Sequence, residues 1–259
     1  MFIRFTQQSQ SFTPPAGSVA VIPLGAVETH GPHLPLGTDG LIAEGILDAA
    51  EAADRGSVTT LRLPLLWLGA SAEHADRAGT LSQEPEELIA ALVRIGEGLA
   101  KCGVNRIVLF NGHGGNVAAA SIAALKLRTK FNMLVASAHW LDFGLPPGLT
   151  PPAPAMADVH GGWIETSVLM HMAPQLVSKD KRAAREAAPP APSLFPAGNI
   201  AWGWKLDDLS KGHVGKSDGG WIGRPDLATP ELGKALVDHA AASLLKLLGE
   251  LAAASWTGR

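Results

Sequence analysis

Short apolar runs alternate with helical segments over the first half of the chain, and this alternation limits the fold more than any other feature. Each run has the length of a strand, whereas the segments between the runs repeat their apolar residues with helical spacing. Such an order predicts an α/β protein with a parallel sheet and helices on both faces. The expected strands are residues 18–24, 58–66, 106–110 and 133–138, and the expected helices are residues 41–53, 85–101 and 117–130.

Single residues mark the ends of two helices. Pro85 suits the first turn of the helix expected over residues 85–101, and Gly103 suits its end. Thr229 can cap a further helix that starts at Pro230 and runs toward the C-terminus. These signals add a helix after the alternating region, and we expect residues 1–259 to form a single domain.

Composition and charge exclude several kinds of protein. The chain carries 21 basic and 24 acidic residues, a net charge of −3, without a basic stripe, so we expect no nucleic-acid partner. We also expect no membrane partner, because no apolar run reaches the roughly 18 residues of a transmembrane helix. The N-terminal residues lack the apolar core of a signal peptide. The single cysteine, Cys102, cannot form an intrachain disulfide, which favours a reducing compartment, and we expect the cytoplasm.

The loop after the first expected strand gathers four side chains that can bind metal. Glu28 and His30 are two residues apart, so an extended backbone points both to one face. Glycines and prolines then turn the chain, which can bring Asp39 back toward them, and His33 lies between. Carboxylate and imidazole groups together suit Zn, Mn or Fe. The alternative is a solvated turn with incidental polar residues, but the cluster as a whole favours a metal site.

A second loop, residues 111–116, follows the strand expected over 106–110. Its Gly112, Gly114 and Gly115 suggest a phosphate-binding turn, but the pattern lacks the last glycine of GxGxxG and the Gly-Lys-Ser/Thr of a Walker A loop. We therefore interpret His113 as a third metal-ligating side chain.

Further polar residues lie outside these two loops. Glu165 falls in the first turn of a helix expected over 163–172, where it could be a helix-terminal charge or a metal ligand. Glu73 and His74 could support the site from behind or lie on the surface. Trp140 could form a wall of a substrate pocket.

Taken together, these segments resemble the creatininase (creatinine amidohydrolase) family. The resemblance implies a creatininase-like αβα sandwich with a mostly parallel sheet, a homohexamer, and two divalent metal ions per chain (Zn, Mn or Fe) that hydrolyse amide-type C–N bonds through a metal-bound hydroxide. It is carried by residues 25–35 (GAVETHGPHLP), Asp39, residues 111–113 (NGH) and residues 160–167 (HGGWIETS), and more weakly by residues 79–82 and 223–229.

The resemblance also implies roles for individual residues. Asp39 would bridge the two metals, with Glu28 and His113 on one and His30 on the other. Creatininase has a glutamate where Gly115 stands, so Glu165 is the preferred fifth ligand. The remaining expected roles are proton transfer by His160 and substrate binding by Trp140, Gly114, Gly115 and His33.

Several functions stay open within and outside this family. The chain could open a small cyclic amide such as creatinine, remove formyl groups from a formamide, or cleave a peptide precursor. For the cyclic amide and the formamide, the resemblance implies that the C–N bond hydrolysed is not a peptide bond. Two alternatives lie outside the hydrolases. The chain could be a metal-binding protein without turnover, or it could be a nucleotide-binding module.

Overall fold

The computed structural model describes residues 1–153, 158–184 and 220–256. In this part of the chain, five parallel strands form one sheet in the order β1-β3-β2-β4-β5. The strands are β1 (Phe2–Arg4), β2 (Val19–Leu24), β3 (Thr60–Arg62), β4 (Arg106–Asn111) and β5 (Leu134–His139). The α-helices are α1 (Thr38–Ala53), α2 (Pro85–Lys101), α3 (Val117–Phe131), α4 (Trp163–Met172) and α6 (Pro230–Ala253).

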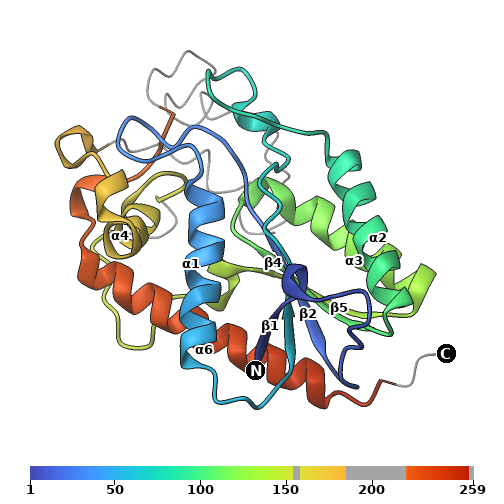
Figure 1. The fold of residues 1–259 in the computed structure, drawn as a ribbon. Helices are drawn as coiled ribbons and strands as arrows, with labels where there is room; N and C mark the ends of the chain where they lie inside the picture. The colour runs from blue at the N-terminus through green and yellow to red at the C-terminus, as the bar shows by residue number, and fades with distance from the viewer. Residues whose placement is uncertain (154–157, 185–219, 257–259) are drawn as a thin grey trace, which may run out of the picture.

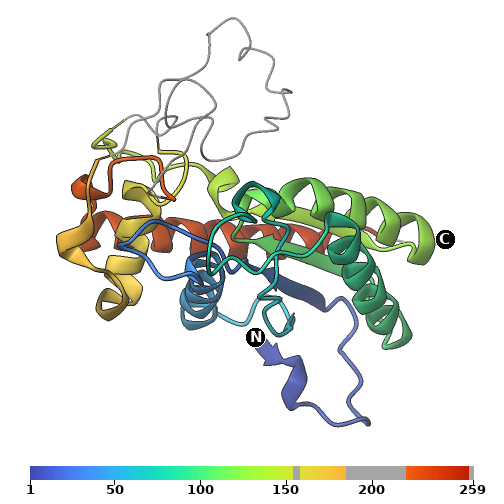
Figure 2. The ribbon, with the colours of Figure 1, turned by 90° about the horizontal axis from the view of Figure 1, so that it is seen from above.

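Helices cover both faces of the sheet (Figures 1 and 2). The period-2 alternation of β2 shows the division, because Val19 and Val21 join one apolar core and Ala20 and Ile22 join the other. The first core is completed by α1, α4 and α6, and the second by α2 and α3. The expected αβα sandwich with a parallel sheet is therefore confirmed.

Most predicted elements lie within three residues of their expected bounds, although α1 starts at Thr38, so that Asp39 lies in its first turn. The strand expected over residues 58–66 is shorter, because Pro64 lacks the N–H that a ladder needs, although Leu66 still forms an isolated parallel bridge with Leu24. The edge strand β1 was not predicted, because its three residues are too few to show a period. No helix in the described ranges has the length and apolarity needed to cross a bilayer.

The strand order decides where a ligand can bind. From β2 the chain moves through α1 to β3 on one side, and then through α2 to β4 on the other side of β2. The connections therefore diverge between β2 and β4, and in open α/β sheets this point forms a crevice at the carboxyl ends of the strands. The two motif-bearing loops follow β2 and β4.

We predict that replacing Thr229 by alanine destabilises the protein by about 1 kcal/mol, the usual cost of losing an N-cap. The Thr229 hydroxyl accepts a hydrogen bond from the Leu232 backbone N–H at 3.2 Å, at the start of α6. Urea denaturation measures the free energy of unfolding. Thr229→Ser keeps the hydroxyl and is the control, and an equal loss in both variants would contradict the capping role.

Candidate metal centre

The loop after β2 folds back so that Glu28 meets the first turn of α1. The Glu28 backbone N–H donates to the Leu36 carbonyl at 2.9 Å, which closes the loop. Gly25 approaches α1 so closely that a Cβ on it would lie 2.7 Å from the Gly40 Cα. A side chain at position 25 would push the loop away from Asp39, so glycine is required for the two carboxylates to meet.

The loop after β4 is tied to the first loop through asparagine side chains. The Asn116 amide donates to the Gly25 carbonyl at 3.0 Å and accepts from the Ala70 N–H at 2.9 Å. The Asn111 side chain accepts from the His113 N–H and donates to the His113 carbonyl. These bonds hold the backbone on both sides of His113, and the ring is 3% exposed.

The start of α4 brings the third segment to the crevice. The Asp158 carboxylate accepts from the N–H groups of Trp163 and Ile164, each at 2.8 Å, and so caps the helix. Burial raises the pKa of Asp158 to about 6. In the first turn, Glu165 accepts from the Gly161 N–H at 2.6 Å through Oε2, which leaves Oε1 directed at the cluster.

These three segments meet at Asp39, whose two oxygens face different histidines. Oδ1 lies 3.2 Å from His30 Nε2, and Oδ2 lies 3.4 Å from His113 Nδ1. His113 Nδ1 is also 3.3 Å from Glu28 Oε1, and His30 Nε2 is 3.9 Å from Glu165 Oε1. The five side chains thus form two adjacent groups of ligand atoms that share the Asp39 carboxylate.

A backbone carbonyl orients each of the histidines in the cluster. His30 donates from Nδ1 to the Glu28 carbonyl at 3.1 Å, and His113 donates from Nε2 to the Ala70 carbonyl at 3.0 Å. His160 donates from Nε2 to the Thr29 carbonyl at 2.6 Å. In each case the second nitrogen is turned toward the carboxylates, which is the arrangement typical of metal-ligating histidine.

Unpartnered oxygens provide the test of whether a cation fits. Glu28 is fully buried, yet within the described part of the chain neither of its carboxylate oxygens has a hydrogen-bond partner, and the same holds for Asp39 Oδ2. Leaving buried carboxylate oxygens unpaired costs several kcal/mol. Divalent cations would satisfy them, and the mixed oxygen and nitrogen donors suit Zn, Mn or Fe.

The ionisable groups of the cluster shift one another's pKa values. Burial lowers the pKa of His30 and His113, but neighbouring carboxylates outweigh it and raise both to about 10. Burial likewise raises the pKa of Glu28, but the protonated imidazole of His113 outweighs it and holds the pKa of Glu28 well below its usual range. Burial raises the pKa of Asp39.

The remaining residues of interest lie around this centre. The His160 ring packs between His30 and His74, with centroids 4.1 Å and 4.4 Å away. His74 is 1% exposed, and burial lowers its pKa to about 2, so its ring is neutral. Glu73 lies beside His113, with Oε1 3.7 Å from Nε2. The alternative that Glu73 and His74 lie on the surface is therefore wrong for His74, which is buried.

The structure puts the expected substrate-binding residues in different surroundings. His33 is buried and donates from Nε2 to the Gly161 carbonyl at 2.8 Å, so it joins the first and third segments. Trp140 is 2% exposed and packs in the core that α1 and α6 share. Gly114 is exposed and Gly115 half-buried beside Glu73.

Sequence reasoning missed the role of Asn116, which joins three loops, because its partners are backbone groups far along the chain.

Known proteins resemble this chain over most of its length. A family model described as creatininase, creatinine amidohydrolase, matches residues 7–248. A relative from Mycobacterium ulcerans (strain Agy99), named mycofactocin precursor peptide peptidase, is 40% identical over 189 residues and is matched over 70% of each chain. Creatinine amidohydrolase from Pseudomonas putida is 30% identical over 181 residues, which cover 63% of this chain and 67% of that protein.

A solved structure adds the same likeness in three dimensions. The crystal structure of a putative creatinine amidohydrolase from Bacteroides fragilis NCTC 9343 has a TM-score of 0.73 at 26% identity and covers 92% of this chain and 91% of that one. With the fold and the cluster described above, the chain is a hydrolase with an αβα sandwich fold and with residues that could hold metal. It belongs to the creatininase family.

We predict that metal uptake releases protons. His30 and His113 have pKa values of about 10 in the metal-free cluster, so both are protonated at pH 8 and must lose that proton to become ligands. Loading chelator-treated protein should release about two protons per chain at pH 8, and affinity should rise with pH toward 10. Calorimetry in buffers of different ionisation enthalpy counts the protons. His239→Ala, far from the cluster, should behave as wild type, and uptake without proton release would contradict the prediction.

Proposed function

We propose that this protein is a binuclear metal-dependent hydrolase that cleaves an amide-type bond in a peptide precursor. The observation that carries the proposal is Asp39, which directs one oxygen to His30 and the other to His113. A carboxylate between two histidines that are each oriented by a carbonyl is suited to bridge two cations.

The ligand sets follow from the distances. Glu28, Asp39 and His113 would hold one ion, and His30, Asp39 and Glu165 would hold the other. Zn, Mn and Fe all suit these donors. Divalent cations in such a centre polarise an amide carbonyl and activate water near neutral pH.

His160 is suited to move a proton at the edge of this centre. Its Nε2 is held by the Thr29 carbonyl, so Nδ1, 3.8 Å from Glu28 Oε1, is the nitrogen free to accept or donate. Stacking on both faces keeps the ring in one orientation. We propose that Nδ1 takes a proton from the attacking water and passes it to the leaving nitrogen of the substrate, so that the ring returns to its neutral form.

The substrate assignment rests on the relatives. The M. ulcerans protein, named a peptide peptidase, is more similar in sequence than the P. putida creatinine amidohydrolase. We therefore favour a peptide bond over creatinine. A formamide or a small cyclic amide is the alternative substrate, and a metal-binding protein without turnover is the alternative outside catalysis.

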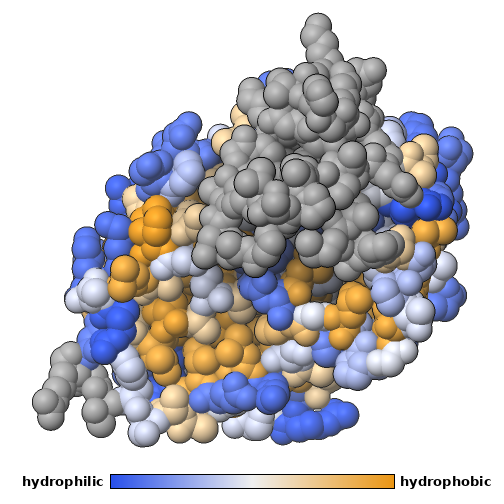
Figure 3. Space-filling view, turned by 180° about the vertical axis from the view of Figure 1, so that it is seen from behind, coloured by the Kyte–Doolittle hydropathy of each residue, from blue (hydrophilic) through white to orange (hydrophobic). Residues whose placement is uncertain are grey.

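Other predictions from the resemblance belong to the same proposal. We propose one catalytic unit per chain, assembled as a homohexamer in the cytoplasm. Exposed apolar side chains on α3, namely Ile122 and Leu125, support self-association, and hydrophobic residues also gather on the face seen from behind (Figure 3). The nucleotide-binding alternative is less favoured, because Gly112 packs its backbone against the start of α1, where a Cβ would meet the Asp39 carbonyl.

We predict that Asp39→Ala lowers metal content below two ions per chain and reduces turnover by at least about 100-fold, because both ions share this carboxylate. Metal content is measured by plasma mass spectrometry, and turnover on a panel of peptides, formamides and creatinine. Asp238→Ala, in an exposed ion pair on α6, is the matched control. Full metal content and normal turnover in Asp39→Ala would contradict the proposal.

A further inference from the structure

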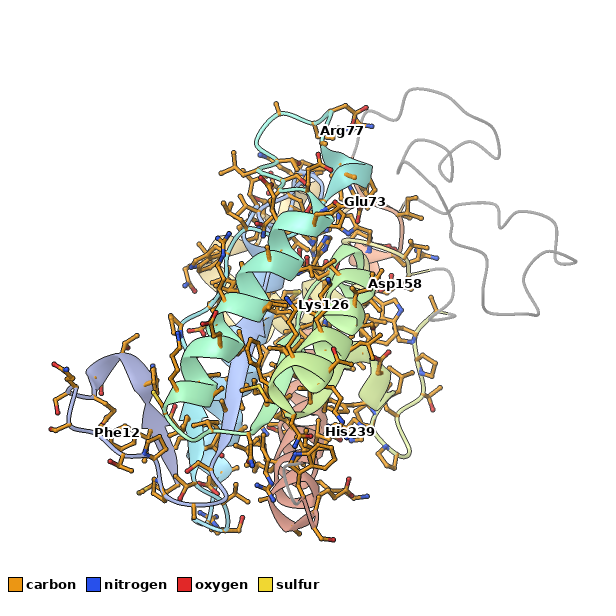
Figure 4. All side chains as sticks on the ribbon, turned by 90° about the vertical axis from the view of Figure 1, so that its right-hand side faces the viewer. Phe12, Glu73, Arg77, Lys126, Asp158 and His239 are labelled. Carbon is orange, nitrogen blue, oxygen red and sulfur yellow. The ribbon has the colours of Figure 1, made fainter. Side chains whose placement is uncertain are left out.

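A short turn forms one side of the candidate metal centre. None of its residues belongs to the two sets of metal ligands proposed above. The 3-10 helix η2 (Ala72–His74) lies between β3 and α2, and its first turn carries Glu73. Figure 4 shows Glu73 in the upper part of the molecule near Arg77, whereas Phe12 and His239 lie in the lower part. The Glu73 side chain is 19% exposed, so it lies at the boundary between the buried cluster and solvent.

The Glu73 carboxylate occupies space that the His113 loop leaves free. A Cβ on Gly115 would lie 2.2 Å from the Ala70 carbonyl oxygen, 2.5 Å from His113 Nε2 and 2.7 Å from Glu73 Oε1, so a side chain at position 115 would clash with this side of the centre. The backbone of the loop can therefore approach η2 only because residue 115 is glycine. The close approach brings a carboxylate from another segment to the side of His113.

Glu73 lies within ligand distance of the buried groups that lack partners. One ligand atom each from Glu28, Glu73 and His113 lie within 4.8 Å of one another. Neither oxygen of Glu28, which is fully buried, has a hydrogen-bond partner among the described residues. The carboxylates of Glu28 and Glu73 repel each other at this separation unless positive charge lies between them, from a protonated His113 or from a bound cation.

A purely structural role explains this position less well. Glu73 is not required to orient His113, because Nε2 of that ring already donates to the Ala70 carbonyl at 3.0 Å. The 3.7 Å separation from Nε2 is also too long for a hydrogen bond.

We propose that Glu73 belongs to the metal centre as a further carboxylate for the ion held by Glu28, Asp39 and His113. The inference rests on the proposed function, since it presumes that ions bind at this cluster. It gives the two ions unequal surroundings. The ion beside Glu73 gains an additional carboxylate near solvent, and the ion beside Glu165 keeps the His30, Asp39 and Glu165 set.

Calorimetric titration of the chelator-treated full chain with Mn²⁺ tests this inference. Wild-type protein should bind two ions. Glu73→Gln, nearly the same size but neutral, should bind one ion as wild type does and the other about 10- to 100-fold more weakly. Glu73→Asp should lose less affinity than Glu73→Gln. Glu86→Gln removes an exposed charge at the start of α2 and should leave both affinities unchanged.

A thermal measurement covers the case in which Glu73→Gln folds poorly. The midpoint of thermal unfolding rises with the logarithm of the ratio of free Mn²⁺ to its Kd, so Glu73→Asp should show a smaller rise than wild type. Two ions bound with wild-type affinity in Glu73→Gln would overturn the inference alone. Wild-type protein that takes up no Mn²⁺, Zn²⁺ or Fe²⁺ would overturn the metal centre and the inference with it.

Discussion

Two carboxylates buried in one crevice are the constraint on which the rest of the structure depends. Glu28 and Asp39 are both essentially inaccessible to solvent, and ionised groups in such positions cost several kcal/mol unless charge and hydrogen bonds compensate. The surrounding molecule supplies that compensation in layers. His30 and His113 face the carboxylates directly, and backbone carbonyls hold each ring in one orientation. Burying such a cluster lowers the stability of the fold, which is expected only where the cluster serves a function. Its carboxylates and oriented imidazoles are suited to hold cations.

The sheet topology explains why these groups meet. Loops after neighbouring parallel strands leave the sheet at the same edge, and the connections from β2 and β4 diverge there. Asn116 and Gly25 then bring the two loops into contact with each other, and the capped start of α4 closes the third side. The apolar cores on the two faces of the sheet make this edge rigid. A rigid frame is what a metal site with several distant ligands requires.

Local signals made much of the fold predictable, and long-range contacts limited the rest. Pro85 and Thr229 marked helix starts because capping and proline geometry act within one turn. Glu28, His30 and Asp39 were recognisable as a cluster because a single loop carries them. The neighbours of Glu73 and the bond from His33 to the Gly161 carbonyl were not predictable, because both join segments that only the folded chain brings together. Trp140 is 2% exposed in the apolar core, and its role in substrate binding stays a prediction.

The central claim is that two ions bind to this cluster and share the Asp39 carboxylate. Crystals of metal-loaded protein test this most directly. Anomalous diffraction at the absorption edge of the bound metal locates each ion independently of turnover. We predict two peaks about 3.5–4 Å apart with Asp39 between them, one beside His113 and one beside His30. A single peak away from Asp39, or no peak in protein loaded with Zn, Mn or Fe, would contradict the account.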